Sequence, residues 1–228
     1  MRSPVFLLLI VAGTTAAALA LLPVPTLEGL FREGGPVENF QAFSWALCAA
    51  LSLVYWLRKQ WSGGLIGAFL LVMLLVRELD FHKRFTAMSV TRTRYYLLPD
   101  VPVLTRLIAA TVVLGTLAVA IVFLRKHLRL FWNALRSGRK WACSAAAGIG
   151  AITVAFLVDK LHGWEGHALT FLRVLGLTPV PLEKLLQIVI EESVELAAPM
   201  LFLLALIQFG RQVGADSTGE PWTSLERV

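Results

Sequence analysis

The sequence is short of charge and of cysteine, and each shortage excludes a class of protein. Only 16% of its residues are charged and 57% are hydrophobic, whereas about 25% of the residues in soluble domains are charged. The composition therefore excludes an ordinary soluble domain. The two cysteines, Cys48 and Cys143, form no CxxC or other metal-binding spacing. Because they fall at different depths of the predicted membrane segments, we expect no disulfide between them.

What the sequence has instead is long apolar runs. A hydrocarbon core of roughly 30 Å is crossed by about 20 helical residues. Six segments reach this length: Val5–Leu22, Val37–Leu57, Trp61–Phe81, Val103–Leu124, Trp141–Leu161 and Leu182–Phe209. The remainder is too short for a second domain. We therefore predict an all-α, polytopic membrane bundle of six transmembrane helices, with residues 1–228 forming a single integral-membrane domain.

The first apolar segment has two interpretations. The basic start Met1-Arg2 and the small residues 16–20 are also typical of a secretory signal peptide. However, the apolar run exceeds the usual length of about 7–15 residues, and Leu21-Leu22 continue it past the candidate cleavage site. We favour an uncleaved helix, and both interpretations leave the later helices in the same orientation.

Basic residues predict the orientation of the helices, because cytoplasmic connections of membrane proteins are rich in Lys and Arg. Arg58 and Lys59 lie between the second and third segments, and Arg211 follows the sixth. The link between the fourth and fifth segments carries Arg125, Lys126, Arg129, Arg136, Arg139 and Lys140. We therefore expect a protein of the bacterial inner membrane with a cytoplasmic N-terminus. Its helices would pair as three outward-pointing hairpins.

The net charge of +6 then reflects topology and contact with anionic membrane lipid, and we expect no nucleic-acid partner. The link over residues 125–140 is predicted to be a short amphipathic helix on the inner surface. No oligomeric state is predicted.

Three acids interrupt the last apolar segment. Glu191, Glu192 and Glu195 can share one helix face, since they are spaced three and four residues apart. Ionisable groups within a membrane are costly, so they usually face the protein interior or a wet cavity and mark function. Glu195 is predicted to lie deepest, and we expect it to be the acid that is hardest to replace.

The three acids are predicted to lie toward the periplasmic end of their helix. Further side chains that can bind metal are predicted at the periplasmic ends of other helices. Glu78 and His82 are four residues apart, and Asp159 and His162 are three apart. Carboxylate and imidazole groups at helical spacing are how helix bundles build metal sites. The candidate ligands of a divalent zinc, manganese or iron ion are thus Glu78, His82, Asp159, His162, Glu191 and Glu195. The alternative is that these acids form ion pairs with nearby arginines.

The connection between the third and fourth segments is basic although it is predicted to face outward. Arg92 and Arg94 are candidates for binding an anionic lipid or lipid-phosphate headgroup, because guanidinium groups match the geometry of phosphate. Their alternative role is to neutralise the acids. Glu38 starts the second segment, where the helix dipole alone favours an acid. Asn39, Gln41 and Ser44 extend a polar strip along that helix.

Known catalytic motifs give no further guidance. The GxSG motif of rhomboid proteases is missing, and His162 and His167 lack the HxxxH spacing of intramembrane ceramidase-like hydrolases. Three hypotheses remain. The first is a metal-dependent enzyme acting on a lipid or lipid-linked phosphate, with Glu195, Glu191 and Asp159 as catalytic acids. The second is a non-catalytic subunit with a structural charge network. The third is a cation- or proton-coupled carrier, which the apolar inner halves of the helices disfavour.

Overall fold

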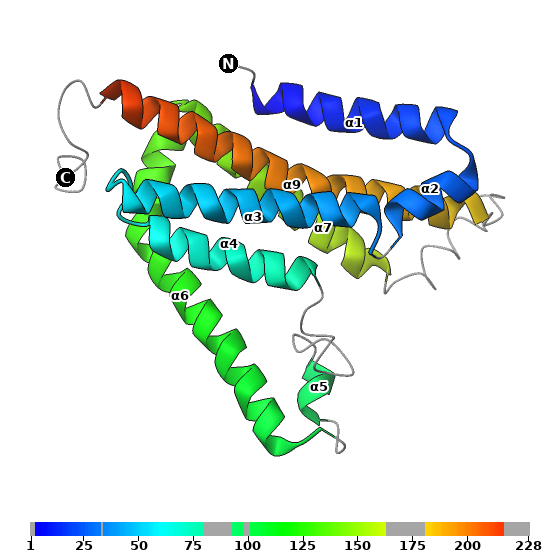
Figure 1. Ribbon diagram of the computed structural model, residues 1–228, viewed down its shortest axis with the longest axis horizontal. Coiled ribbons are helices and arrows are strands. Elements are labelled where there is room, and N and C mark those ends of the chain that lie inside the picture. Colours follow the sequence, from blue (N-terminus) through cyan, green and yellow to red (C-terminus); the bar gives the residue numbers. More distant parts are fainter. Residues whose placement is uncertain (1–2, 33, 80–92, 98–100, 163–180, 217–228) are drawn as a thin grey trace. The chain divides into compact units, whose positions relative to one another are not determined.

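The computed structural model describes residues 3–32, 34–79, 93–97, 101–162 and 181–216, and every regular element among them is a helix (Figure 1). Within these ranges, the side chains of residues 93–94, 158–162, 181–187 and 214–216 lie outside the description. The helices are α1 (Pro4–Leu21), α2 (Val24–Phe31), α3 (Pro36–Leu57), α4 (Gly64–Glu78), α5 (Thr93–Leu97), α6 (Val103–Arg136), α7 (Lys140–His162) and α9 (Pro181–Asp216). The predicted all-α class is confirmed.

Five stretches of helix in the described part of the chain are long and apolar enough to cross a membrane. They are Pro4–Leu21, Val24–Leu57, Val103–Arg136, Lys140–Leu157 and Ile188–Val213. The remaining predicted segment, Trp61–Phe81, corresponds to α4, which has 15 residues. At 1.5 Å per residue α4 is only about 22 Å long, so a count of six spans remains a prediction. The five apolar stretches are typical of a membrane protein.

The chain divides into two compact units. The first unit contains residues 1–44 and 138–209, and the second contains residues 45–137 and 210–228. The acids of α9 and the polar strip at the start of α3 both belong to the first unit. Glu78 of α4 belongs to the second unit.

In the first unit, the short helix α2 packs against the part of α9 that carries the glutamates. Leu27 and Phe31 form a core with Val189, whose side chain is fully buried. Pro23 precedes α2 as its N-cap and has the extended backbone conformation that prolines allow at a helix start. The connection from α2 to α3 turns at Gly34, whose φ of +72° favours glycine. These contacts fix where α3 begins relative to α9.

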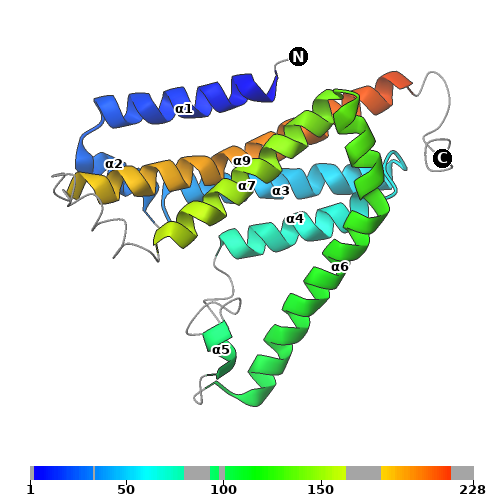
Figure 2. The same ribbon diagram turned by 180° about the vertical axis from the view of Figure 1, so that it is seen from behind.

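Helix α1 also packs within the first unit. It runs antiparallel to α9 in both views of the molecule (Figures 1 and 2) and also contacts α7. Helices α7 and α9 approach closely at Gly148, where a Cβ atom would lie 2.9 Å from the ring of Phe202. A larger residue at Gly148 would require the Phe202 ring or the helices themselves to shift.

In the second unit, α4 packs against the end of α3 and along α6. Ser52 donates a hydrogen bond of 2.8 Å to the carbonyl oxygen of Gly64. A Cβ atom at Gly67 would lie 2.9 Å from Ser52 Oγ, so a small residue is needed there. Trp61 meets the rings of Phe123 and His127 edge to face.

Helix α6 differs from its prediction. The apolar segment was expected to end at Leu124 and to be followed by a separate surface helix, but α6 continues through the basic residues to Arg136. The sequence changes from apolar to basic at Arg125, but it contains no proline there that would interrupt the helical hydrogen bonds. The helix therefore continues. The Arg136 guanidinium lies 5.3 Å from the centre of the Trp132 ring at the end of the helix.

Candidate functional site

The acidic turn of α9 is regular helix. Ser193 is buried, and Glu191, Glu192 and Glu195 are half-buried. Pro199 lies within the same helix and is fully buried. Because proline has no N–H group, Pro199 cannot donate the usual helical hydrogen bond to the carbonyl of Glu195. The acids thus occupy a membrane-spanning helix just before a position that lacks one of its regular bonds.

Gln41 of α3 connects the polar strip to this acidic turn. Its side chain is fully buried. Its Nε2 donates one hydrogen bond of 2.9 Å to the backbone carbonyl of Glu192 and another of 3.3 Å to Glu192 Oε2. Phe40 and Phe43, on either side of this strip, are 49% and 58% exposed. The start of α3 therefore turns its amide toward α9 and its aromatic rings outward.

Glu192 is under the influence of three other acids of the first unit. Electrostatic repulsion from Glu195, Glu38 and Glu191 acts on its carboxylate. Like charges that are partly withdrawn from water repel strongly, because the surrounding dielectric constant is low. Such a cluster favours a positively charged ligand or a proton.

Glu38 has a local role at the start of α3. Its carboxylate accepts a hydrogen bond from the backbone amide of Gly34. Asn39 Nδ2 donates to the carbonyl oxygens of Gly34 and Gly35, at 3.2 and 3.0 Å. These bonds hold the glycine turn against the first turn of the helix. The interpretation of Glu38 as a helix-start acid therefore has a structural basis.

A pair of hydroxyl groups joins α1 to α9 one residue beyond Glu192. Thr15 Oγ1 lies 2.8 Å from Ser193 Oγ and 2.8 Å from the carbonyl oxygen of Val11, and Ser193 donates to the carbonyl of Val189 at 2.6 Å. Each hydroxyl has one hydrogen. With Ser193 donating to Val189 and Thr15 donating to Ser193, both hydrogens are used within the protein.

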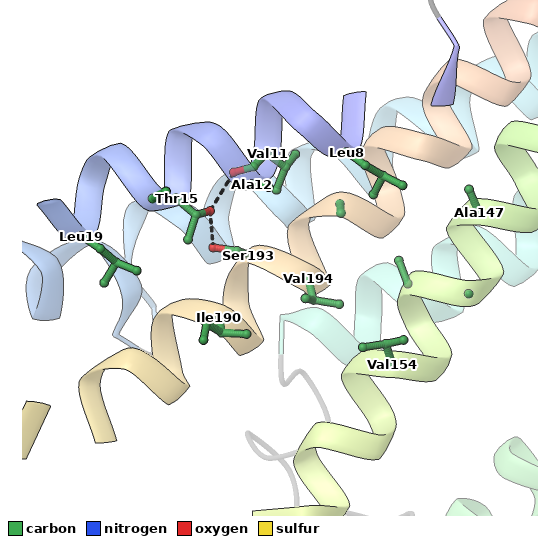
Figure 3. A pocket seen from close by; sticks show the side chains of 14 residues that line it. Leu8, Val11, Ala12, Thr15, Leu19, Ala147, Val154, Ile190, Ser193 and Val194 are labelled. Carbon is green, nitrogen blue, oxygen red and sulfur yellow. Dashed lines mark hydrogen bonds between the residues drawn. The ribbon is translucent and has the colours of Figure 1, made fainter. Parts of the chain in front are cut away.

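A groove of about 610 Å³ opens beside this hydroxyl pair, between α1, α7 and α9 (Figure 3). Its walls include Leu8, Leu19, Ala147, Val154, Ile190 and Val194. Thr15 and Ser193 are its polar residues, and their hydrogens are already committed. The groove thus offers hydrocarbon contact and no available side-chain donor.

A second buried amide lies further along α9. Ser144 of α7 donates a hydrogen bond of 2.9 Å to Oε1 of Gln208, and both side chains are buried. Gln208 Nε2 has no hydrogen-bond partner among the residues that the structure describes. This pair joins α7 to α9 at about 24 Å along the helix from Glu192.

The predicted ligands are placed only in part. Glu191 and Glu195 lie with Glu192 in the first unit, and Glu78 ends α4 in the second unit. For Asp159, His162 and Arg94 only the helical backbone is described, and His82 and Arg92 lie outside the described residues. Among described residues, no group of three or more His, Cys, Asp or Glu side chains is arranged to hold a metal ion.

Two residues of the site were not among the predicted ligands. Gln41 was noted only as part of a polar strip, and Glu192 was ranked behind Glu195. The available signal was the spacing of Gln41 and Ser44, which puts two polar side chains on one face of an apolar helix; both are buried in the structure.

No protein-family model matches the chain, and neither a curated protein nor a solved structure matches it.

Proposed function

We propose that this membrane protein is a metal-dependent hydrolase or transferase acting on a lipid or lipid-linked phosphate. In this proposal, six helices form three outward-pointing hairpins in the bacterial inner membrane, the N-terminus is cytoplasmic, and the acidic turn of α9 faces the periplasm. The observation that supports it is the apolar groove, because residues of the acidic turn also line it. Ile190, Ser193 and Val194 contribute to the groove, and Glu191, Glu192 and Glu195 are their neighbours in the sequence.

The groove favours a hydrocarbon chain as its occupant. It lies between helices that are apolar enough to span a membrane, and its hydroxyl groups have no hydrogen left to donate. A buried apolar chain gains about 0.8 kcal/mol for each CH₂ removed from water. A lipid chain in a bilayer is already out of water, so this gain does not apply there. Van der Waals packing against the groove walls then decides which chain binds. An amphiphile held there would carry its headgroup to the acidic turn.

The headgroup chemistry follows from charge. A phosphate beside several carboxylates requires a cation between them, and a divalent metal held by these acids would provide it and would lower the pKa of a bound water. In the proposed reaction Glu195 or Glu191 would take up the proton of a water as the water oxygen bonds to the terminal phosphorus of a lipid diphosphate. The bond from that phosphorus to the bridging oxygen would break, which releases inorganic phosphate and leaves the bridging oxygen on the lipid monophosphate. We propose Asp159, His162, Glu78 and His82 as further ligands, and Arg92 and Arg94 as headgroup contacts.

The test is lipid retention together with turnover. The purified protein is incubated with a polyprenyl diphosphate, retained lipid is measured by native mass spectrometry, and released phosphate is measured with added Mn²⁺. Gly150→Phe places a ring in the groove, because no atom lies within 4 Å of a Cβ at Gly150. We expect both retention and turnover to fall about tenfold, the effect of about 1.4 kcal/mol.

Gly115→Phe is the matched control, since a Cβ at Gly115 of α6 also meets no atom within 4 Å and this residue does not line the groove. This variant should behave as the wild type. Equal lipid retention in the wild type and Gly150→Phe contradicts the proposal.

A second candidate function is a non-catalytic membrane subunit. The hydrogen bonds from Gln41 to Glu192 and between Thr15 and Ser193 tie α3, α1 and α9 together, and polar side chains commonly join helices in membranes. Under this hypothesis the acids serve stability alone. Absence of turnover with every lipid phosphate, combined with loss of stability on replacing Glu192, favours the subunit.

A further inference from the structure

Only one of the two polar atoms of the Gln41 amide has a hydrogen-bond partner among the described residues. Its Nε2 donates to the carbonyl oxygen and to the carboxylate of Glu192, whereas its Oε1 has no hydrogen-bond partner among the described residues. The side chain is fully buried. A buried carbonyl oxygen without a partner is costly, and native proteins usually provide one, either from the protein itself or from a bound species.

The amide group that carries this oxygen lies beside negative charge. The same amide group is hydrogen-bonded to the Glu192 carboxylate, on which Glu195, Glu38 and Glu191 exert electrostatic repulsion. A water molecule would satisfy Gln41 Oε1 but would leave the repulsion among the acids unchanged. A cation would do both, because it accepts oxygen ligands and offsets negative charge.

We infer that Gln41 Oε1 and the carboxylate of Glu192 form the protein part of a binding site for a hard divalent cation such as Mn²⁺, Mg²⁺ or Ca²⁺. Amide and carboxylate oxygens are the ligands these ions prefer, and Mg²⁺ in particular is held by one or two protein oxygens, several waters and substrate phosphate. A zinc ion would instead require a cage of nitrogen, sulfur or carboxylate ligands. The described residues contain no such group of three.

The role of the ion, which is to link the acidic turn to a phosphate headgroup, rests on the proposed function. The cation site also changes the predicted ligand set, since neither Gln41 nor Glu192 was among its members. Binding of the ion itself does not require the lipid, so the two proposals can fail separately.

The experiment uses Mn²⁺ alone as the probe. The full chain is placed in nanodiscs of a zwitterionic lipid, and free Mn²⁺ is measured by electron paramagnetic resonance during a titration. We expect saturable binding to the wild type and a lower affinity in Gln41→Leu and in Glu192→Gln. The loss should be at least about 10-fold, because removal of a residue that only orients a metal ligand already costs about 10–100-fold. Excess Mg²⁺ or Ca²⁺ should displace the bound Mn²⁺.

Gln208→Leu is the matched control, because Gln208 is a buried glutamine of the same unit that contacts no carboxylate in the described hydrogen bonds. It should bind Mn²⁺ as the wild type does. Thermal unfolding provides a second measurement: Mn²⁺ should raise the melting temperature of the wild type and of Gln208→Leu, but not of Glu192→Gln, which keeps the size of the side chain.

Equal Mn²⁺ affinity in the wild type, Gln41→Leu and Glu192→Gln overturns the inference, as does the absence of saturable binding to the wild type. A water-filled site would give this second result. Mn²⁺ binding that depends on Gln41, in a protein that retains no lipid phosphate, supports the ion site and contradicts the proposed function.

Discussion

The two buried glutamines of the first unit present opposite atoms to their surroundings. Gln41 uses its nitrogen on Glu192 and leaves an oxygen without a partner, whereas Gln208 uses its oxygen on Ser144 and leaves its nitrogen. The first lies beside acids and the second beside a hydroxyl. The same type of side chain therefore belongs to the proposed cation site at the acidic turn of α9 and forms a structural hydrogen bond in the later part of the helix.

The largest expected effect concerns which membrane face each end occupies. The link containing Gly138 precedes Ser144, and the connection containing Gly166 precedes the acidic turn. Alkaline phosphatase fused after Thr91 or Gly166 should be active, and fused after Gly138 it should be inactive, because the enzyme matures only in the oxidising periplasm. Activity after Gly138 with silence after Gly166 would reverse the comparison and move the acids to the cytoplasm.

The next effect is on turnover. Glu195→Gln keeps size and hydrogen bonding but removes the negative charge. We expect this variant to lose at least about 100-fold in turnover of a lipid phosphate, the size of effect typical of general acid–base groups, while the protein still inserts and unfolds at nearly the wild-type temperature. If Glu195 only balances a cation, the variant should instead lose stability, because it strands a partly buried charge. Full activity with full stability would show that this carboxylate is dispensable.

A smaller effect is expected on the free energy of unfolding, which should fall more for a change at Gln41 than for one at Gln208. Gln41→Leu removes two hydrogen bonds to Glu192 and should cost about 1–3 kcal/mol in free energy of unfolding. Gln208→Leu removes an unsatisfied Nε2, and Ser144 Oγ can turn to a carbonyl of its own helix, so its cost should be under about 1 kcal/mol. Denaturation in mixed detergent micelles measures both. A larger loss for Gln208→Leu would contradict the comparison.

The smallest effect is the coupling between Ser144 and Gln208. A double-mutant cycle with Ser144→Ala and Gln208→Leu should give about 0.6 kcal/mol, the usual strength of such bonds between membrane helices. The same denaturation measurement applies. Additive losses would mean that the 2.9 Å bond contributes nothing to stability.

The sequence predicted the helices better than their ends. Apolar length located α1, α3, α6, α7 and α9, because a membrane-spanning helix must be apolar along its whole length. It missed α2, whose eight residues are too few to span and include Pro25 and Gly29. It also ended α6 too early, since a change from apolar to basic residues alters the surroundings of a helix without breaking its hydrogen bonds.

The site was less accessible to prediction, for a different reason. The acidic turn of α9 was evident from three glutamates in an apolar run. The partner of Glu192 was not, because Gln41 is 151 residues away in the sequence. Helical spacing relates residues on one helix only. Which face of α3 meets which face of α9 depends on packing, including that of α2 against Val189.

The length of α6 bears on how the protein responds to the thickness of its bilayer. Its 34 residues extend about 51 Å, whereas a hydrocarbon core is about 30 Å thick and helices tilt by at most about 40°. Even at that tilt the whole helix is longer than the core is thick, so the part from Arg125 onward must leave the hydrocarbon. A thinner or thicker membrane then shifts the point of emergence along an unbroken helix, and α6 adjusts to either without losing a backbone hydrogen bond.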